Sequence, residues 1–254
     1  MAAIVEGALV RSIRRFGATA LFLFRLLAQC GPAFERPGLI INQVYNAGAR
    51  SLIIIMLSGT FTGAVLGLQG YNLLQRFGSE DALGMAAALG LLRELGPVLT
   101  SLLFAGRAGT ALTSEIGLMR ATDQIDAMEM MAVDPLAYVV APRFIAGIIA
   151  MPILACVFNA LGIFGAHLVG VSWLGLDNGT FWSNMTSSVD VWKDVVNGVW
   201  KSVAFGAVVT LIATFQGYTT APTSEGVAYA TTRTVVFSSI VTLALDFVMT
   251  AFLM

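Results

Sequence analysis

The sequence predicts an all-α membrane protein with an N-terminal amphipathic interfacial helix, five transmembrane helices, and a cytosolic helix between the second and third spans. Of the 254 residues, 57% are hydrophobic and 11% are charged, and the mean hydropathy is +0.82. Charged surface is therefore too scarce to cover a water-soluble core. Five apolar stretches are long enough to cross a bilayer as helices. The whole chain, 1–254, is predicted to form one membrane domain.

The N-terminal segment 1–40 is predicted to lie on the membrane surface. Its uncharged run from Phe16 to Phe24 is too short to span a bilayer, and no small-residue cleavage site follows, which excludes a signal peptide. At 100° per residue one face carries Arg11, Arg14, Arg15 and Arg25, and the opposite face is apolar. This pattern indicates an interfacial helix on an anionic leaflet. The alternative is a helix packed on the protein itself.

The five-span bundle, 51–254, is predicted to have its helices at 51–75, 82–105, 144–173, 195–217 and 234–254. Most arginines then lie on one side, and only Arg76 and Lys193 lie on the other. By the positive-inside rule the N-terminus is cytosolic, the C-terminus is not, and 106–142 faces the cytosol. The segment 174–194, with Trp182 and Trp192 in it and Trp173 at its edge, is expected at the outer surface.

Four charged residues lie inside predicted spans, where an unpaired charge costs about 3 kcal/mol or more. At about 1.5 Å per residue, three of these residues, on separate helices, fall at a similar depth below the outer face. The charges either brace the bundle as ion pairs or line a polar pocket for a charged headgroup. The four residues are Arg93, Glu94, Lys201 and Asp246.

Two helix features accompany these charges. Pro97 lacks the N–H that would bond the carbonyl of Arg93, so the helix is expected to bend or open there, as helices do around transporter sites. In the first span Gly59, Gly63 and Gly67 form a smooth stripe, suited equally to packing within the chain and to a dimer seam.

Apolar side chains near the outer end of the first span are candidates for contact with acyl chains. For any single one of them, ordinary packing or lipid exposure is the simpler interpretation. The candidates are Leu66, Tyr71, Leu73, Leu74 and Phe77.

The segment from Asp126 to Pro135 is predicted to be a short acidic helix between two spans. A polytopic protein needs such an element where something outside the membrane pushes on it, as in ATP-driven permeases. The Met-rich, acidic-edged pattern is typical of an adaptable docking surface. The coupling candidates are Asp126, Met128, Glu129, Met130, Met131, Asp134 and Pro135.

Catalytic and metal sites are not predicted. Neither lysine follows a glycine, so the chain has no P-loop and any ATPase is a separate subunit using ATP and Mg²⁺. His167 is the only histidine, which excludes a His-Glu-x-x-His zinc site and a Ser-His-Asp triad; it and Asn159 are expected to be packing residues. Gly106-Arg-Ala-Gly109 is expected to break the second span. A net charge of -1 implies no nucleic-acid partner.

Two family resemblances follow from motifs. The run from Asp126 to Pro142 resembles the EAA loop of bacterial ABC importers, with Ala132 where glycine is usual and the closing proline about three residues early. A longer series, from Asn42 to the C-terminus, resembles the MlaE-type permeases of the MCE, or Mla, phospholipid-transport ABC systems of Gram-negative inner membranes. That series comprises Val65-Leu-Gly-Leu-Gln-Gly-Tyr71, Leu91-Leu-Arg-Glu-Leu-Gly-Pro97, Phe104-Ala-Gly-Arg-Ala-Gly109, Glu115-Ile-Gly-Leu-Met-Arg-Ala-Thr122, Met128-Glu-Met-Met-Ala-Val-Asp-Pro135 and Ala230-Thr-Thr-Arg-Thr-Val235.

The resemblance implies a homodimer that binds phospholipid in its cavity and helps to maintain outer-membrane lipid asymmetry. It also implies a cytosolic ABC ATPase pair, a STAS-domain regulatory protein and a periplasmic MCE-domain hexamer. Two rival functions remain at this point. An ion-coupled secondary transporter would use Asp246 or Glu94 as a proton site, and a membrane scaffold would move no lipid. A secondary transporter leaves the cytosolic helix unexplained.

Overall fold

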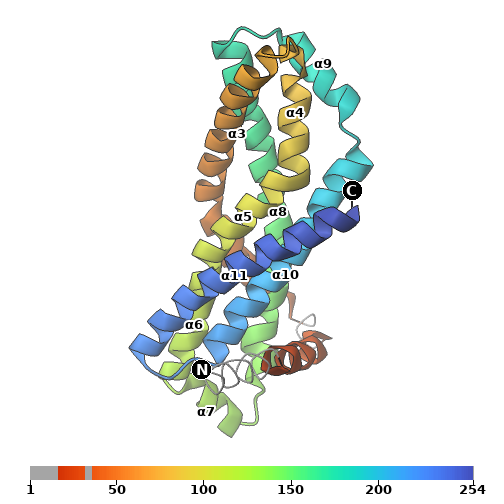
Figure 1. The fold of residues 1–254 in the computed structure, drawn as a ribbon. Coiled ribbons are helices and arrows are strands. Elements are labelled where there is room, and N and C mark those ends of the chain that lie inside the picture. Colours follow the sequence, from red (N-terminus) through yellow and green to blue (C-terminus); the bar gives the residue numbers. More distant parts are fainter. Residues whose placement is uncertain (1–16, 32–35, 254) are drawn as a thin grey trace, which may run out of the picture.

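The computed structural model describes residues 17–31 and 36–253, which form a helical bundle with five helices long and apolar enough to cross a membrane (Figure 1). The five spans comprise 37–75, 80–121, 136–173, 191–218 and 224–252. The predicted number of spans and the helical class are confirmed. The helices extend beyond the predicted bounds, most of all the second, because polar and charged turns continue the helices past their apolar cores.

The helices are bounded as follows. The first span joins α2 (Pro37–Gly48) through the turn η1 (Ala49–Ser51) to α3 (Leu52–Gln75), and the second joins η2 (Glu80–Ala82), α4 (Leu83–Gly90), η3 (Leu91–Leu95), α5 (Gly96–Phe104), η4 (Ala105–Gly109) and α6 (Thr110–Ala121). The third joins η5 (Leu136–Val140), α8 (Ala141–His167) and η6 (Leu168–Trp173). The remaining elements are α7 (Gln124–Met130), α9 (Asn178–Ser188), η7 (Val191–Val195), α10 (Val196–Tyr218) and α11 (Ser224–Leu253).

The bundle has two distinct ends. Figure 1 shows α6 and α7 at one end of the bundle. The other end holds the tips of the first three spans, with α9 leading away from the third. The last helix, α11, crosses obliquely and ends well short of that tip. Among the five spans, the third is the most buried and the last is the least buried. The third span, built on α8, therefore forms the core, whereas α11 lies at the edge with most of its surface uncovered.

The glycine stripe of the first span packs within the chain. Gly59, Gly63 and Gly67 lie against the backbone of Phe158, Gly162 and Ala166 on α8, so close that an added Cβ would overlap it. Because small residues let two helix backbones approach, this face fixes α3 on α8. Of the two alternatives for the stripe, packing within the chain is the one observed.

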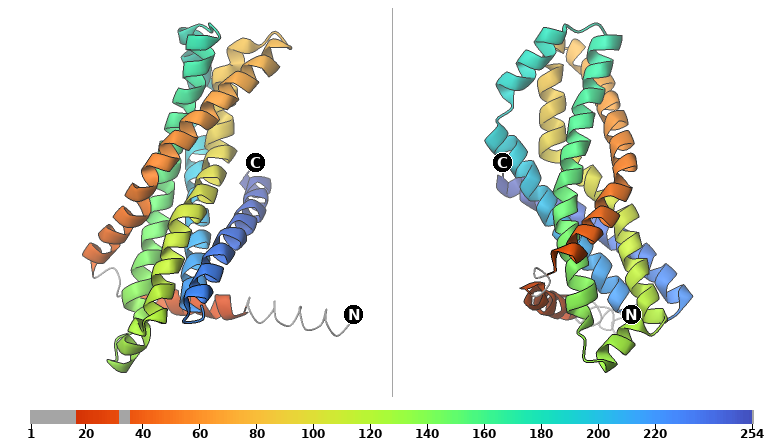
Figure 2. Two further views of the ribbon diagram at one scale, coloured as in Figure 1. Left: turned by 90° about the vertical axis from the view of Figure 1, so that its left-hand side faces the viewer. Right: turned by 180° about the vertical axis from the view of Figure 1, so that it is seen from behind.

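The Gly17–Gly31 helix lies across the end of the bundle that carries α7 (Figure 2). Phe22 and Leu26 are buried, and the Phe22 ring lies 5.4 Å from that of Phe215. The neighbouring Leu21 and Phe24 are exposed. The helix thus packs on the protein by one face and leaves a second apolar face free for lipid. Arg11, Arg14 and Arg15 lie outside the described residues.

The predicted surface segment 1–40 extends past the start of the next helix, α2. The described helix stops at Gly31, and α2 begins at Pro37, which favours the first position of a helix because its fixed φ suits it and its missing N–H is not needed there. Residues 37–40 therefore belong to the helix that leads into the first span.

The expected helix break at Gly106-Arg-Ala-Gly109 is wrong. These residues lie in the π-helical turn η4, and the helix continues to Ala121. The hydroxyl of Thr110 donates to the carbonyls of Gly106, at 2.7 Å, and Arg107, at 3.0 Å, and the Thr110 backbone N–H also donates to the Arg107 carbonyl, so local hydrogen bonds hold the turn. The glycines are accommodated by this turn instead of ending the helix.

Candidate functional site

A buried ammonium group connects three helical elements at one depth. Lys201 Nζ of α10 lies 2.8 Å from Glu94 Oε2 of η3, 3.2 Å from Asp246 Oδ1 of α11 and 2.7 Å from the Thr250 hydroxyl. The lysine side chain is 3% exposed, whereas those of Glu94 and Asp246 are 31% and 19% exposed. We call Glu94, Lys201, Asp246 and Thr250 the Lys201 cluster. It is buried on the lysine side and open on the carboxylate side.

Lys201 also binds a backbone carbonyl that Pro97 leaves without its usual N–H donor. The helix forms the π-helical turn η3 immediately before it, so the expected change at Arg93-Glu94 is confirmed. The carbonyl of Arg93, which Pro97 has no N–H to serve, accepts instead from Lys201 Nζ at 3.0 Å. The same ammonium group therefore satisfies a backbone oxygen and holds two carboxylates.

Arg93 belongs to a separate pair. Its guanidinium lies 2.6 Å from Asp194 Oδ1, and the other oxygen of Asp194 accepts from the backbone N–H of Asp190 at 2.8 Å. Asp194 is almost fully buried, whereas the Arg93 side chain is 41% exposed. The fixed carboxylate holds the arginine in place while part of its side chain remains free to contact a ligand.

Two residues of the site, Asp194 and Thr250, are not among those that the sequence predicts. The predicted outer segment 174–194 includes Asp194, but η7 brings it into the first turn of the fourth span. The four predicted charges sum to zero, so nothing in them called for a fifth. The sequence feature that could have identified Asp194 is that it is an acid near the level of Arg93. Thr250 lies four residues after Asp246, on the same face of α11.

The apolar candidates on the first span divide into two groups. Leu66 packs against the main core, and Tyr71 and Leu74 pack against the buried cluster of Leu83 and Phe181. Leu73 and Phe77 are 58% and 75% exposed. Only these last two present most of their surface to a possible acyl chain.

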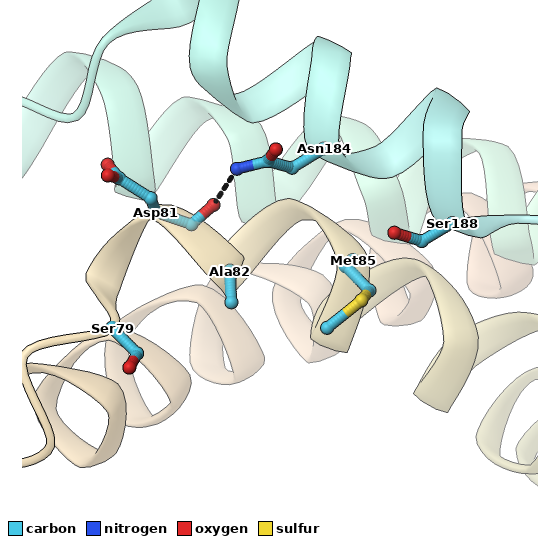
Figure 3. Close-up of a pocket in the computed structure, with 6 residues that line it drawn as sticks. All are labelled: Ser79, Asp81, Ala82, Met85, Asn184 and Ser188. Carbon is cyan, nitrogen blue, oxygen red and sulfur yellow. Dashed lines mark hydrogen bonds between the residues drawn. The ribbon is translucent and has the colours of Figure 1, made fainter.

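A hollow of about 280 Å³ lies at the tip of the bundle, between the α3–α4 connection and α9. Figure 3 shows its lining residues and the hydrogen bond, 2.8 Å long, from the Asn184 amide to the Asp81 carbonyl. Its lining contains none of the predicted site residues and no cation. The hollow is therefore distinct from the Lys201 cluster.

The predicted docking helix is present but shorter than expected. It is α7, and it ends at Met130, because Ala132 adopts a left-handed backbone with φ of 58° that a continuing helix forbids. This is the position where the EAA pattern usually has glycine, the residue that tolerates such a conformation best.

The coupling candidates have unequal surroundings. Met128 packs inward near Ile125 and Pro135 is buried, while Asp134 Oδ1 accepts from the backbone N–H of Leu136, the first residue of η5. The exposed members are Asp126, Glu129, Met130, Met131 and Asp134, and the two methionines are 88% and 67% exposed. Fewer residues are therefore available to contact a partner than the sequence predicts.

Comparisons with known proteins cover almost the whole chain. The family described as "Permease MlaE" matches residues 40–252. The "Intermembrane phospholipid transport system permease protein MlaE" of Haemophilus influenzae is 55% identical over 238 residues, which is 94% of this chain and 91% of that protein. A "Probable ABC transporter permease protein" of Rickettsia typhi is 34% identical, over 96% of this chain and 94% of its own length. "Protein TRIGALACTOSYLDIACYLGLYCEROL 1, chloroplastic" of Arabidopsis thaliana is 32% identical, over 84% of this chain and 60% of its own length.

Proposed function

The chain belongs to the MlaE permease family, and on that basis we propose that it is the membrane subunit of an ABC transporter that moves phospholipid between the inner and outer membranes. The observation that carries this is the near full-length identity of 55% to a phospholipid transport permease, together with a charged cluster inside a bundle of apolar spans. Such movement maintains the lipid asymmetry of the outer membrane. The protein is a multi-pass membrane protein and is not itself the ATPase.

The Lys201 cluster and Arg93 receive the phospholipid headgroup in this proposal. The exposed part of Arg93 meets the phosphate, since a guanidinium matches phosphate oxygens with two parallel hydrogen bonds. Glu94 and Asp246 present partly open carboxylates beside it, which would balance an amine on the headgroup. Leu73 and Phe77 are available for the acyl chains, with Leu66, Tyr71 and Leu74 packed behind them.

The exposed face of α7 is the surface through which a cytosolic ABC ATPase acts. Met130 and Met131 supply flexible apolar contacts, and Asp126 and Glu129 supply an acidic edge. Tyr218 at the end of α10 donates to Glu129 at 3.3 Å, which links α7 directly to a membrane span. The partner ATPase uses ATP and Mg²⁺, and this chain contributes no cofactor.

Membership of the family supports the following assembly, which is part of the proposal. Two copies of the chain form a homodimer around the lipid cavity, a STAS-domain protein regulates the ATPases, and an MCE-domain hexamer stands on the periplasmic side. The exposed apolar length of α11, next to the open side of the Lys201 cluster, favours closure of that cavity by a second copy. The chain lies in the bacterial inner membrane with its N-terminus and α7 in the cytosol and its C-terminus periplasmic, consistent with the arginine distribution.

The test is co-purification followed by reconstituted transfer. The chain should retain an ATPase subunit and phospholipid, and in proteoliposomes the complex should move labelled phospholipid to acceptor vesicles only while ATP is hydrolysed. Lipid movement driven by a proton gradient without any ATPase would contradict the proposal. Retention of the partners with no lipid movement would indicate a scaffold.

A further inference from the structure

Two further arginines line a small hollow that the proposed lipid cavity does not use. Arg50 comes from η1 and Arg107 from η4, and Gln43 and Asn46 of α2 line the same hollow. We propose that this hollow binds a phosphate oxygen of an anionic phospholipid from the leaflet nearest α7. The site goes beyond the proposed function, because Arg107 lies 13 residues past Glu94 on the second span, about 20 Å nearer α7 along the helix.

Two helix faces meet to form the hollow. Residues 43, 46, 47 and 50 recur at helical spacing on one face, and residues 107, 108, 111 and 115 do so on the other. Alanines 47, 108 and 111 leave space between the two arginines. The hollow measures about 20 Å³, which is room for one water-sized atom. It fits a single phosphate oxygen, with the rest of the headgroup at its mouth.

The arginines keep unused donors. Arg107 Nη1 donates to the Asn46 carbonyl in the last turn of α2, at 2.9 Å, and to the Ser51 hydroxyl, at 3.4 Å. Its other nitrogens have no partner among residues 17–31 and 36–253, and in the same ranges Arg50 forms no hydrogen bond or ion pair. The one acid in the lining, Glu115, is shared with Arg143 at 3.4 Å. The hollow therefore has excess positive charge.

The exposed face of α3 supplies the reason to favour lipid over a free anion. Ile53, Leu57 and Phe61 follow Arg50 at three, seven and eleven residues, so they continue its face of the helix, and they are 73%, 56% and 68% exposed. A phosphate bound at Arg50 would place an acyl chain along this apolar strip. Inorganic phosphate would gain nothing from it.

The test measures protection of a reporter cysteine in the hollow. The full chain carries Gln43→Cys, which shortens a side chain of the lining, with Cys30→Ser and Cys156→Ala, and alkylation by N-ethylmaleimide is timed in nanodiscs of phosphatidylcholine with increasing phosphatidylglycerol. Phosphatidylglycerol should slow the reaction. Arg50→Gln, which removes no hydrogen bond or ion pair within the described part of the chain, should raise the phosphatidylglycerol fraction needed for half protection by about fivefold. Arg76→Gln, an arginine on the other side, should change nothing.

Four outcomes would overturn the site. Protection of equal size in pure phosphatidylcholine, or protection that Arg50→Gln leaves unchanged, would show that headgroup charge is not recognised. Protection by millimolar inorganic phosphate in phosphatidylcholine discs would assign the hollow to a free anion. Protection that appears only when the ATPase is bound would assign it to a protein contact.

Discussion

Replacing Lys201 with methionine should destabilise the protein strongly, and neutralising its partners should reverse the loss. The methionine keeps the length of the side chain but removes the ammonium that serves Glu94, Asp246, Thr250 and the carbonyl of Arg93. Removing one partner of a buried ion pair costs about 3–5 kcal/mol. Because both carboxylates are partly exposed, water covers part of the loss, and we expect about 2–3 kcal/mol.

The triple variant Lys201→Met, Glu94→Gln, Asp246→Asn separates stability from binding. It leaves no stranded charge, so its free energy of unfolding should return to within about 1 kcal/mol of the wild type, since neutral replacements of buried ion pairs are often tolerated. Its phospholipid content should stay low, because the headgroup has lost its charged partners. Lys193→Met, at an exposed lysine, is the matched control and should change neither quantity.

The assay pairs reversible denaturant unfolding in mixed micelles with mass spectrometry of the retained lipid. A triple variant as unstable as Lys201→Met would show that the stranded charges are not the cause. A stable triple variant with normal lipid content would show that the Lys201 cluster braces the bundle without binding lipid.

Three further predictions test other parts of the account. Glu129→Lys, or Met130→Asp with Met131→Asp, should weaken ATPase retention in pull-downs more than tenfold with an unchanged melting temperature, because all three residues are exposed. The control Trp192→Asp, at the opposite end, should not weaken retention. Normal retention in the α7 variants would reject the docking surface. Gly63→Ala should cost about 1–3 kcal/mol of unfolding free energy because its Cβ meets the backbone of α8, whereas Gly90→Ala, with open space beside it, should be neutral or stabilising; equal effects would contradict the α3–α8 packing. Changing Arg11, Arg14 and Arg15 to glutamate should weaken the binding of the N-terminal peptide to anionic liposomes by about 1 kcal/mol per charge removed, and unchanged affinity would refute the interfacial assignment.

The fold was predictable because each span is long, apolar and separated from the next by charge. The helix ends were less so, since propensity near a span boundary is decided by local hydrogen bonds. Thr110 shows this: its hydroxyl donates to the carbonyls of Gly106 and Arg107 within η4, and the helix passes through two glycines that the sequence alone marks as a break. The end of α7 is also set locally, because the left-handed backbone of Ala132 stops the helix early.

The charged site was predictable in part. Counting residues along helices placed Lys201 and Asp246 at one depth, and the ion pair between them agrees with that placement. Which acid pairs with Arg93 depends on how η7 joins α10, and periodicity carries no information on that junction. Leu73 and Phe77 are exposed whereas Leu74 is packed, and this difference depends on where α9 contacts α4. That contact joins segments that are distant in the sequence, so the sequence pattern does not predict it.

Photocrosslinking with a phospholipid that carries its reactive group on the headgroup tests the central claim most directly. The wild-type complex in nanodiscs is irradiated with and without ATP hydrolysis, and the adducts are mapped by peptide mass spectrometry. We expect adducts on residues 91–97, 194–201 and 246–250, reduced during ATP turnover and lost in the triple variant. Adducts confined to the outward faces of the spans, unchanged by ATP and by the triple variant, would contradict the assignment of the Lys201 cluster as the headgroup site.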